Sequence, residues 1–149
     1  MPTWTAEYTT AIKREEQERF ALAKRAIHTD TGPVQGSPYS PAVRVDNTIF
    51  ISGQIPIDPA TGLVVQGDFA TQVRQCLRNL AAVLKQEGLG LDSVVKTTVF
   101  LTDLQNFQEL NRIYGPYFTG VKPARSTIQV SRLPLDVAVE IEAIAIAGQ

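Results

Sequence analysis

Short β-branched segments alternate with two amphipathic segments between residues 42 and 147, and this order leaves few possible folds. Strands are predicted at residues 42–45, 48–52, 94–101, 124–130 and 137–147, and helices at residues 68–88 and 104–117. The first two strands form a hairpin through the turn pair Asp46-Asn47, and Gly53 is expected to end the second strand. The β-β-α-β-α-β-β order predicts a single α+β domain, a sandwich with both helices on one face of a sheet.

The helix predicted at residues 68–88 has the clearest pattern. Its apolar side chains recur at helical spacing and are Phe69, Val73, Cys76, Leu77, Leu80 and Leu84. Asp68 is expected as its N-cap and Gly88 as its C-terminal stop. Cys76 lies on the apolar stripe, which favours a place in the core over a nucleophilic role. Because Cys76 is the only cysteine, an intramolecular disulfide and a cysteine-based zinc site are excluded.

The second predicted helix begins after Asp103, a capping residue, and carries an apolar stripe with one polar member. The stripe consists of Phe107, Leu110, Tyr114 and Phe118. Asn111 follows Phe107 by four positions and so falls inside this stripe. A buried amide there must find hydrogen-bond partners or cost about 1–3 kcal/mol. Asn111 is therefore either a packing residue or a ligand contact.

The N-terminal part has a weaker pattern. Residues 5–27 show helical spacing, but the middle, from Lys13 to Arg19, is almost wholly polar or charged. We expect an extra helix on the outside, and we divide the chain into an N-terminal helical extension, residues 1–25, and a folded domain, residues 26–149. Residues 31–41 hold three prolines and two glycines, which predicts a shaped loop.

Composition and missing motifs exclude several classes of protein. The formal net charge of -1 and the lack of Lys/Arg clusters argue against a nucleic-acid partner, and no apolar run approaches the roughly 20 residues of a membrane span. A cytoplasmic protein is expected; a mitochondrial one is the alternative, although the N-terminal glutamates are unusual for a transit peptide. His28 is the only histidine, and no GxSxG, P-loop or GxGxxG motif is present. These observations favour chemistry without a metal or cofactor.

Two charged residues on the last strands are the candidates for such chemistry. Strand alternation places Arg125 on one face with Thr127, and Glu140 shares a face with Glu142. An arginine fork fits a carboxylate in two-point contact, and a glutamate partly screened from water can act as general acid or base. The alternative is a solvated sheet edge or an intersubunit ion pair between Arg125 and a glutamate, which spacing alone leaves open.

Several segments resemble the RidA/YjgF family of reactive-intermediate imine deaminases, over roughly residues 26–147. The matching segments are Ser37-Pro38-Tyr39-Ser40-Pro41, Ile51-Ser52-Gly53-Gln54-Ile55-Pro56, Lys96-Thr97-Thr98-Val99-Phe100, Asn111-x-x-Tyr114-x-x-Tyr117-Phe118, Pro123-Ala124-Arg125-Ser126 and Glu140-Ile141-Glu142-Ala143-Ile144. The resemblance implies a chorismate-mutase-like domain that forms a homotrimeric barrel, with a site in each cleft between subunits. The two helices leave one face of the sheet bare, and we expect an oligomer in which another copy covers this face. A trimer would supply that cover. The residues alone suggest a hairpin of strands 124–130 and 137–147, whereas the resemblance implies that the last strand inserts between strands 48–53 and 94–101.

The resemblance also implies a reaction, the hydrolysis of enamine and imine acids such as 2-aminoacrylate and 2-iminobutanoate to 2-oxo acids and ammonia. Arg125 matches the carboxylate-binding arginine, and Glu140 matches the glutamate that positions or activates water. Tyr39, Ser52, Gly53 and Asn111 match pocket positions, and Thr127 stands where many relatives have cysteine. Arg125 and Glu140 are then expected to meet across subunits.

Other hypotheses for the function remain open. A non-catalytic regulator that binds 2-oxo acids would use Arg125 in the same way. Some relatives are described as single-strand ribonucleases, translation inhibitors or chaperone-like proteins, but the charge and the lack of an exposed basic-aromatic platform speak against RNA binding.

Overall fold

The computed structural model describes residues 6–29 and 36–148 and contains every strand and helix predicted between residues 42 and 147, together with two more elements at the N-terminus. The strands are β1 (Lys24–Ile27), β2 (Ala42–Val45), β3 (Thr48–Gln54), β4 (Val94–Leu101), β5 (Ala124–Gln129) and β6 (Val139–Ile146). The helices are α1 (Ala6–Ala23), α2 (Phe69–Lys85) and α3 (Phe107–Tyr114), with 3-10 turns at Leu91–Ser93, Leu104–Asn106, Gly115–Tyr117 and Pro134–Asp136.

The described strands form one mixed sheet in the order β1-β2-β3-β6-β4-β5. Only the β4–β5 pair is parallel among these strands. The insertion of β6 between β3 and β4 is confirmed, and the hairpin of β5 with β6 is wrong. The reason is burial: every second residue of β6 is buried, which suits a central strand, whereas β5 is mostly exposed and lies at the edge.

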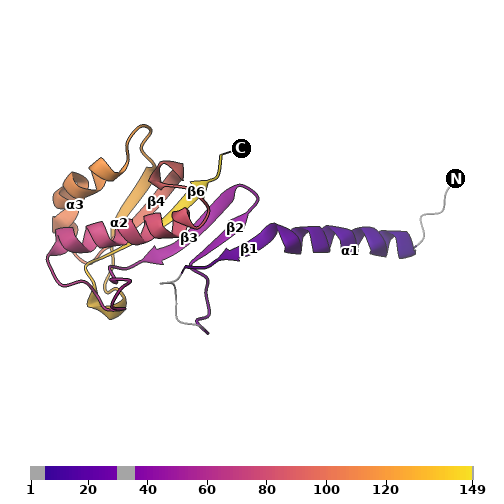
Figure 1. The fold of residues 1–149 in the computed structure, drawn as a ribbon, viewed down its shortest axis with the longest axis horizontal. Helices are drawn as coiled ribbons and strands as arrows, with labels where there is room; N and C mark the ends of the chain where they lie inside the picture. Colours follow the sequence, from indigo (N-terminus) through magenta and orange to yellow (C-terminus); the bar gives the residue numbers. More distant parts are fainter. Residues whose placement is uncertain (1–5, 30–35, 149) are drawn as a thin grey trace.

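Helices α2 and α3 pack against each other on one face of the sheet, as predicted, while α1 projects beyond β1 and away from the sheet (Figure 1). The covered face is apolar and includes Val139, Ile141, Ala143 and Ala145 of β6. The opposite face is bare within the chain and exposes large apolar side chains. Phe50 is 49% exposed, Ile128 45% and Ile146 42%. We call this surface the open face.

The α2 prediction is confirmed in detail. The Asp68 side chain accepts a hydrogen bond from the Thr71 N–H, so it caps the helix as expected. The chain leaves α2 through Gly88, whose φ of 69° is the left-handed conformation that favours glycine. Cys76 is fully buried in the core, and burial raises the pKa of its thiol, so it is not poised as a nucleophile.

The second predicted helix is shorter than expected. A 3-10 turn precedes α3, and Asp103 caps that turn by accepting a hydrogen bond from Gln105 N–H. After Tyr114 the chain tightens into another 3-10 turn that contains Pro116, which has no N–H to continue an α-helix. The last strand is shorter as well, because the turn Pro134–Asp136 delays its start to Val139, and β3 runs one residue past Gly53.

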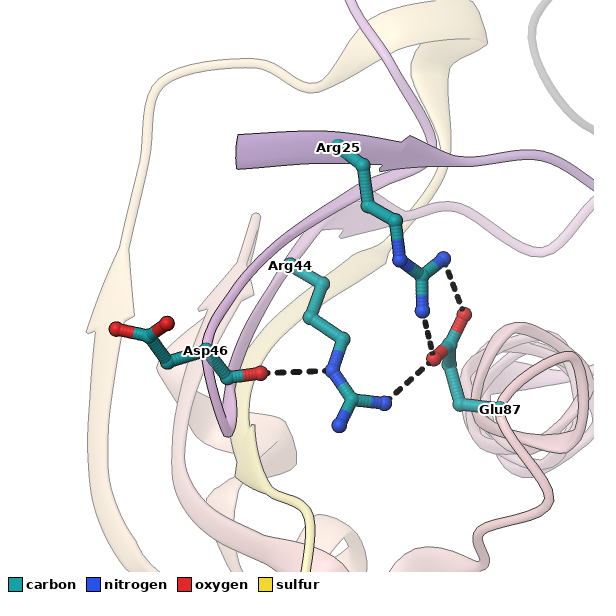
Figure 2. Close-up of polar contacts among 4 residues, drawn as sticks. All are labelled: Arg25, Arg44, Asp46 and Glu87. Atoms are coloured by element: carbon teal, nitrogen blue, oxygen red, sulfur yellow. Dashed lines mark hydrogen bonds and ion pairs between the residues drawn. The ribbon is translucent and has the colours of Figure 1, made fainter. Parts of the chain in front are cut away.

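The N-terminal prediction is partly wrong. The helix ends at Ala23, and the next four residues form β1, which pairs with β2. Arg25 and Arg44 are direct partners in this pair, and the Glu87 carboxylate accepts hydrogen bonds from both guanidinium groups (Figure 2). These long-range bonds offset the like-charge pairing and favour a strand over a helix. Of the loop predicted at residues 31–41, residues 31–35 lie outside the described residues; the remainder forms turns and bends.

None of the helices in the described part of the chain is long and apolar enough to cross a bilayer.

Candidate active site

Arg125 extends from the edge strand β5 over helix α3. Its Cα partner on β4 is Thr97, which is fully buried, so the Arg125 side chain lies on the helix-covered face. The Arg125 Nη2 donates a 2.6 Å hydrogen bond to Asn111 Oδ1. The guanidinium carbon lies 4.9 Å from the Tyr114 ring centroid and 5.5 Å from that of Phe107, within cation–π range of both.

Asn111 is exposed, and this corrects the expectation that its amide is buried in the apolar stripe. The physical reason is that α3 turns only Leu110, Ile113 and Tyr114 into the core. Asn111 faces Arg125 instead, and its amide oxygen accepts from the guanidinium. The amide NH₂ is a donor that this bond leaves unused.

Glu140 lies at the other candidate centre, on the open face of β6. A Cβ added to Gly53 would overlap its carboxylate, whose Cδ lies 2.8 Å from that position. Only glycine therefore permits this close approach. Burial, and then the neighbouring charge of Glu142, raise the pKa of Glu140 above its ordinary value. A carboxyl shifted in this direction is better matched to proton transfer near neutral pH.

Ser52 joins this centre to the segment that carries Tyr39. The Ser52 hydroxyl donates a 2.7 Å hydrogen bond to the Ser40 carbonyl, and the Ser52 N–H donates to the Pro41 carbonyl. Both donors are thus committed to structure, which holds the chain after Tyr39 against β3. The Tyr39 ring is 60% exposed. Tyr39 therefore lies in a segment that Ser52, the residue before Gly53, holds against β3.

Thr127 lies two residues beyond Arg125 on the same face, and its hydroxyl oxygen is buried without a hydrogen-bond partner among the described residues. The backbone is a separate matter. Because the Val130 N–H donates to Leu101 on β4, strand alternation turns the Thr127 N–H and C=O toward the free edge of β5. The main-chain N–H and C=O of Thr127 therefore point to an edge with which none of the other described strands pairs.

One chain does not bring Arg125 and Glu140 together. Arg125 lies on the helix-covered face at the edge strand, whereas Glu140 pairs with Phe100 on the open face two strands away. None of the ion pairs found among the described residues joins Arg125 to a glutamate. We therefore distinguish an arginine group, Arg125 with Asn111 and Thr127, from a glutamate group, Glu140 with Tyr39, Ser52 and Gly53.

The sequence did not identify Phe107 and Tyr114 as members of the site, although both contact Arg125. A signal was present: Phe107, Asn111 and Tyr114 follow one another at helical i, i+4 and i+7 spacing and so share one face of α3. The apolar members were assigned to the core. Tyr114 serves both purposes, because its buried hydroxyl is hydrogen-bonded to Thr97 Oγ1 at 2.6 Å while its ring faces Arg125.

This architecture defines a small α+β domain with a mixed sheet, two helices packed on one face and Arg125 on the edge strand. A family model described as Endoribonuclease L-PSP matches residues 29–147. The chain belongs to this family, the RidA/YjgF family.

Individual relatives agree with that assignment. The protein DfrA of Myxococcus xanthus is 52% identical over 128 residues, which cover 85% of this chain and 98% of that protein. The 2-iminobutanoate/2-iminopropanoate deaminase of Homo sapiens is 46% identical over 128 residues, covering 86% and 93%. The crystal structure of the E. coli YjgF gene product matches with a TM-score of 0.76 and 45% identity, covering 82% and 98%.

Proposed function

We propose that this protein is a cofactor-free hydrolase that converts reactive enamine and imine acids, such as 2-aminoacrylate and 2-iminobutanoate, to 2-oxo acids and ammonia. The observation that carries the proposal is the number of Arg125 hydrogen-bond donors that are left for a ligand. A guanidinium has five N–H donors, and the bond to Asn111 uses one of them. The remaining donors suit two-point binding of a substrate carboxylate. The human relative named 2-iminobutanoate/2-iminopropanoate deaminase supports this substrate class.

In the proposed reaction, Glu140 takes a proton from water as the water oxygen bonds to the imine carbon. The electron pair of the C=N π bond moves to the protonated imine nitrogen, which gives a neutral carbinolamine. Glu140 then returns the proton to that nitrogen and takes the proton of the carbinolamine hydroxyl as the C=O bond forms, the C–N bond breaks and ammonia leaves. The product is the 2-oxo acid. An enamine first accepts a proton at its terminal carbon and becomes the imine. The raised pKa of Glu140 supports this exchange, since the same group gives and takes a proton.

We place the site between two copies of the chain. The arginine group of one copy and the glutamate group of another would form its two walls, because the two groups lie on opposite faces of one sheet. Three copies joined through the open face give every arginine group a partner and bury the exposed apolar side chains of that face. Tyr39 and the backbone of Gly53 and Thr127 complete the proposed pocket.

The test is a coupled assay in which an amino-acid oxidase generates imines and semicarbazide traps them. Wild-type protein is expected to lower semicarbazone formation. Arg125→Ala should reduce kcat/KM by at least about 100-fold, because the carboxylate loses a charged two-point contact. The matched control is Arg112→Ala, since Arg112 is an exposed arginine on α3 whose pair with Glu109 spans 3.6 Å.

If wild-type protein leaves the trapped yield unchanged but binds 2-oxo acids, the chain is a non-catalytic regulator. The description of the family model makes ribonuclease activity the other alternative. RNA cleavage that copurifies with the trimer and disappears in Arg125→Ala would favour that alternative over deamination.

A further inference from the structure

The Arg125 guanidinium is held from the side of α3 by three residues that the helix places on one face. Asn111 supplies a hydrogen bond to Nη2, and Phe107 and Tyr114 supply ring faces 5.5 and 4.9 Å from the guanidinium carbon. We call Phe107 and Tyr114 the aromatic pair. Phe107 is 36% exposed, so its ring is not needed merely to fill the core, whereas Tyr114 is buried and serves both the core and Arg125.

We propose that the aromatic pair positions Arg125, fixing the plane of its guanidinium so that its free N–H groups meet a substrate carboxylate. This inference rests on the proposed function for the identity of the ligand. The residues of the pair are positioning residues, because they act through Arg125 and need not touch the substrate.

The geometry favours a fixed guanidinium. A long arginine side chain at a sheet edge has many rotamers, and two-point binding uses only those that aim its flat fork at the ligand. A ring face attracts the cation and a planar guanidinium can stack on it, whereas an aliphatic side chain of similar size offers only packing. Binding then requires less ordering of Arg125.

Tyr114 is itself anchored. Its hydroxyl is hydrogen-bonded to the fully buried Thr97, and its ring lies 4.6 Å, centroid to centroid, from that of Phe118. Thr97 is also the Cα partner of Arg125 across the β4–β5 pair. The ring and the arginine are therefore tied to the same point of the sheet, which keeps their separation constant.

A positioning role for the aromatic pair predicts different effects for substitutions that keep a ring and for those that remove it. Phe107→Leu removes a ring but keeps an apolar side chain, and is expected to raise KM for the imine acid and Kd for a 2-oxo acid by about 3- to 10-fold. The change in kcat should stay within about twofold, because ground and transition states share the carboxylate contact. Phe107→Tyr keeps an aromatic ring at this position, so its KM and Kd should be close to the wild-type values. Tyr114→Phe keeps the ring but loses the bond to Thr97, so it should raise KM less than Tyr114→Leu, which removes the ring.

A control variant and a double mutant make the test specific. Leu104→Ala, at a position 41% exposed in the preceding turn, is the control and should change neither constant. In the Arg125→Ala background, Phe107→Leu should have no further effect on Kd, because the guanidinium that Phe107 contacts is absent.

A measurement without substrate separates this inference from the proposed function. The Arg125 Nε–Hε NMR signal, assigned by its loss in Arg125→Lys, should report an order parameter above about 0.8 in wild type and below about 0.6 in Phe107→Leu. An unchanged order parameter, or an equal loss of affinity in Phe107→Tyr and Phe107→Leu, overturns the positioning role. If wild type neither deaminates nor binds 2-oxo acids, the proposed function fails, and the NMR comparison still decides whether the aromatic pair fixes Arg125.

Discussion

Gly53 is the residue that most directly permits the glutamate group to form. A side chain there would overlap the Glu140 carboxylate, which is the far end of a flexible side chain and can move away. Gly53→Ala is therefore expected to change the free energy of unfolding by less than about 1 kcal/mol while reducing kcat nearly as much as Glu140→Ala does. Urea unfolding and the imine assay check the two parts. A large loss of stability with full kcat would contradict the account.

The raised pKa of Glu140 predicts the acid limb of the pH profile. As a base the carboxyl must be ionised, so kcat/KM should rise with pH through a value above the ordinary 4.5. Glu142→Gln removes the like charge and should move this limb to lower pH while activity is retained. Glu140→Gln should abolish the limb. A limb that stays in place in Glu142→Gln would show that another group controls it.

At the residue scale, the sequence named residues of the candidate site but did not predict how they are arranged. The contact of Asn111 with Arg125 unites two residues that the sequence had singled out separately. The ring contacts of Phe107 and Tyr114 were missed, because an apolar residue at helical spacing has the same pattern whether it faces the core or a cation. The sequence alone cannot separate those two uses.

Strand β1 is the element whose attachment depends on charge. The Glu87 side chain is only 7% exposed, and it accepts hydrogen bonds from Arg25 and Arg44, the two partners across β1 and β2 (Figure 2). Hydrogen bonding to Arg25, and less strongly to Arg44, lowers the pKa of the Glu87 carboxyl below its ordinary value. A buried carboxylate with two charged donors should stabilise this end of the sheet.

Glu87→Gln is therefore expected to lower the free energy of unfolding by about 1–3 kcal/mol at pH 7. Because the folded pKa is lowered, this stabilisation is complete above pH 4.5 and is lost as the pH falls through the folded pKa. Thermal or urea unfolding across this range measures it. Glu109→Gln is the control, since its exposed pair with Arg112 should contribute less than about 0.5 kcal/mol. Equal effects of the two substitutions at pH 7 would contradict this role for Glu87.

Local pattern was sufficient for the elements that are regular and buried on one side. Helix α2, the β2–β3 hairpin and β4 were predicted from spacing, caps and turn residues. The local pattern failed to predict β1, because its four residues continue a helical pattern. They become a strand only through pairing with β2 and bonds to Glu87. The place of β6 could not be read from adjacent segments, because its pairing partners lie far away in the sequence.

At the scale of the whole molecule, the open face predicts an oligomer, and the proposed function takes it to be a trimer. Phe50 lies on that face beside Ile144 and is 49% exposed in the single chain. Phe50→Glu places a charge in the proposed interface and should shift the scattering mass from trimer toward monomer, with loss of deaminase activity. Far-UV circular dichroism should stay native, because the residue does not face the core. A native monomeric variant with full activity would contradict a site shared between copies.

The central claim, that one site takes Arg125 from one copy and Glu140 from another, has a direct measurement. Arg125→Ala and Glu140→Ala chains are each expected to be inactive alone. Mixed in equal amounts and reassembled at random into trimers, they should regain activity in about one quarter of the sites, those that pair an intact arginine group with an intact glutamate group. If the mixed trimers, verified by mass, stay as inactive as either parent, then both residues must come from the same chain and the account is wrong.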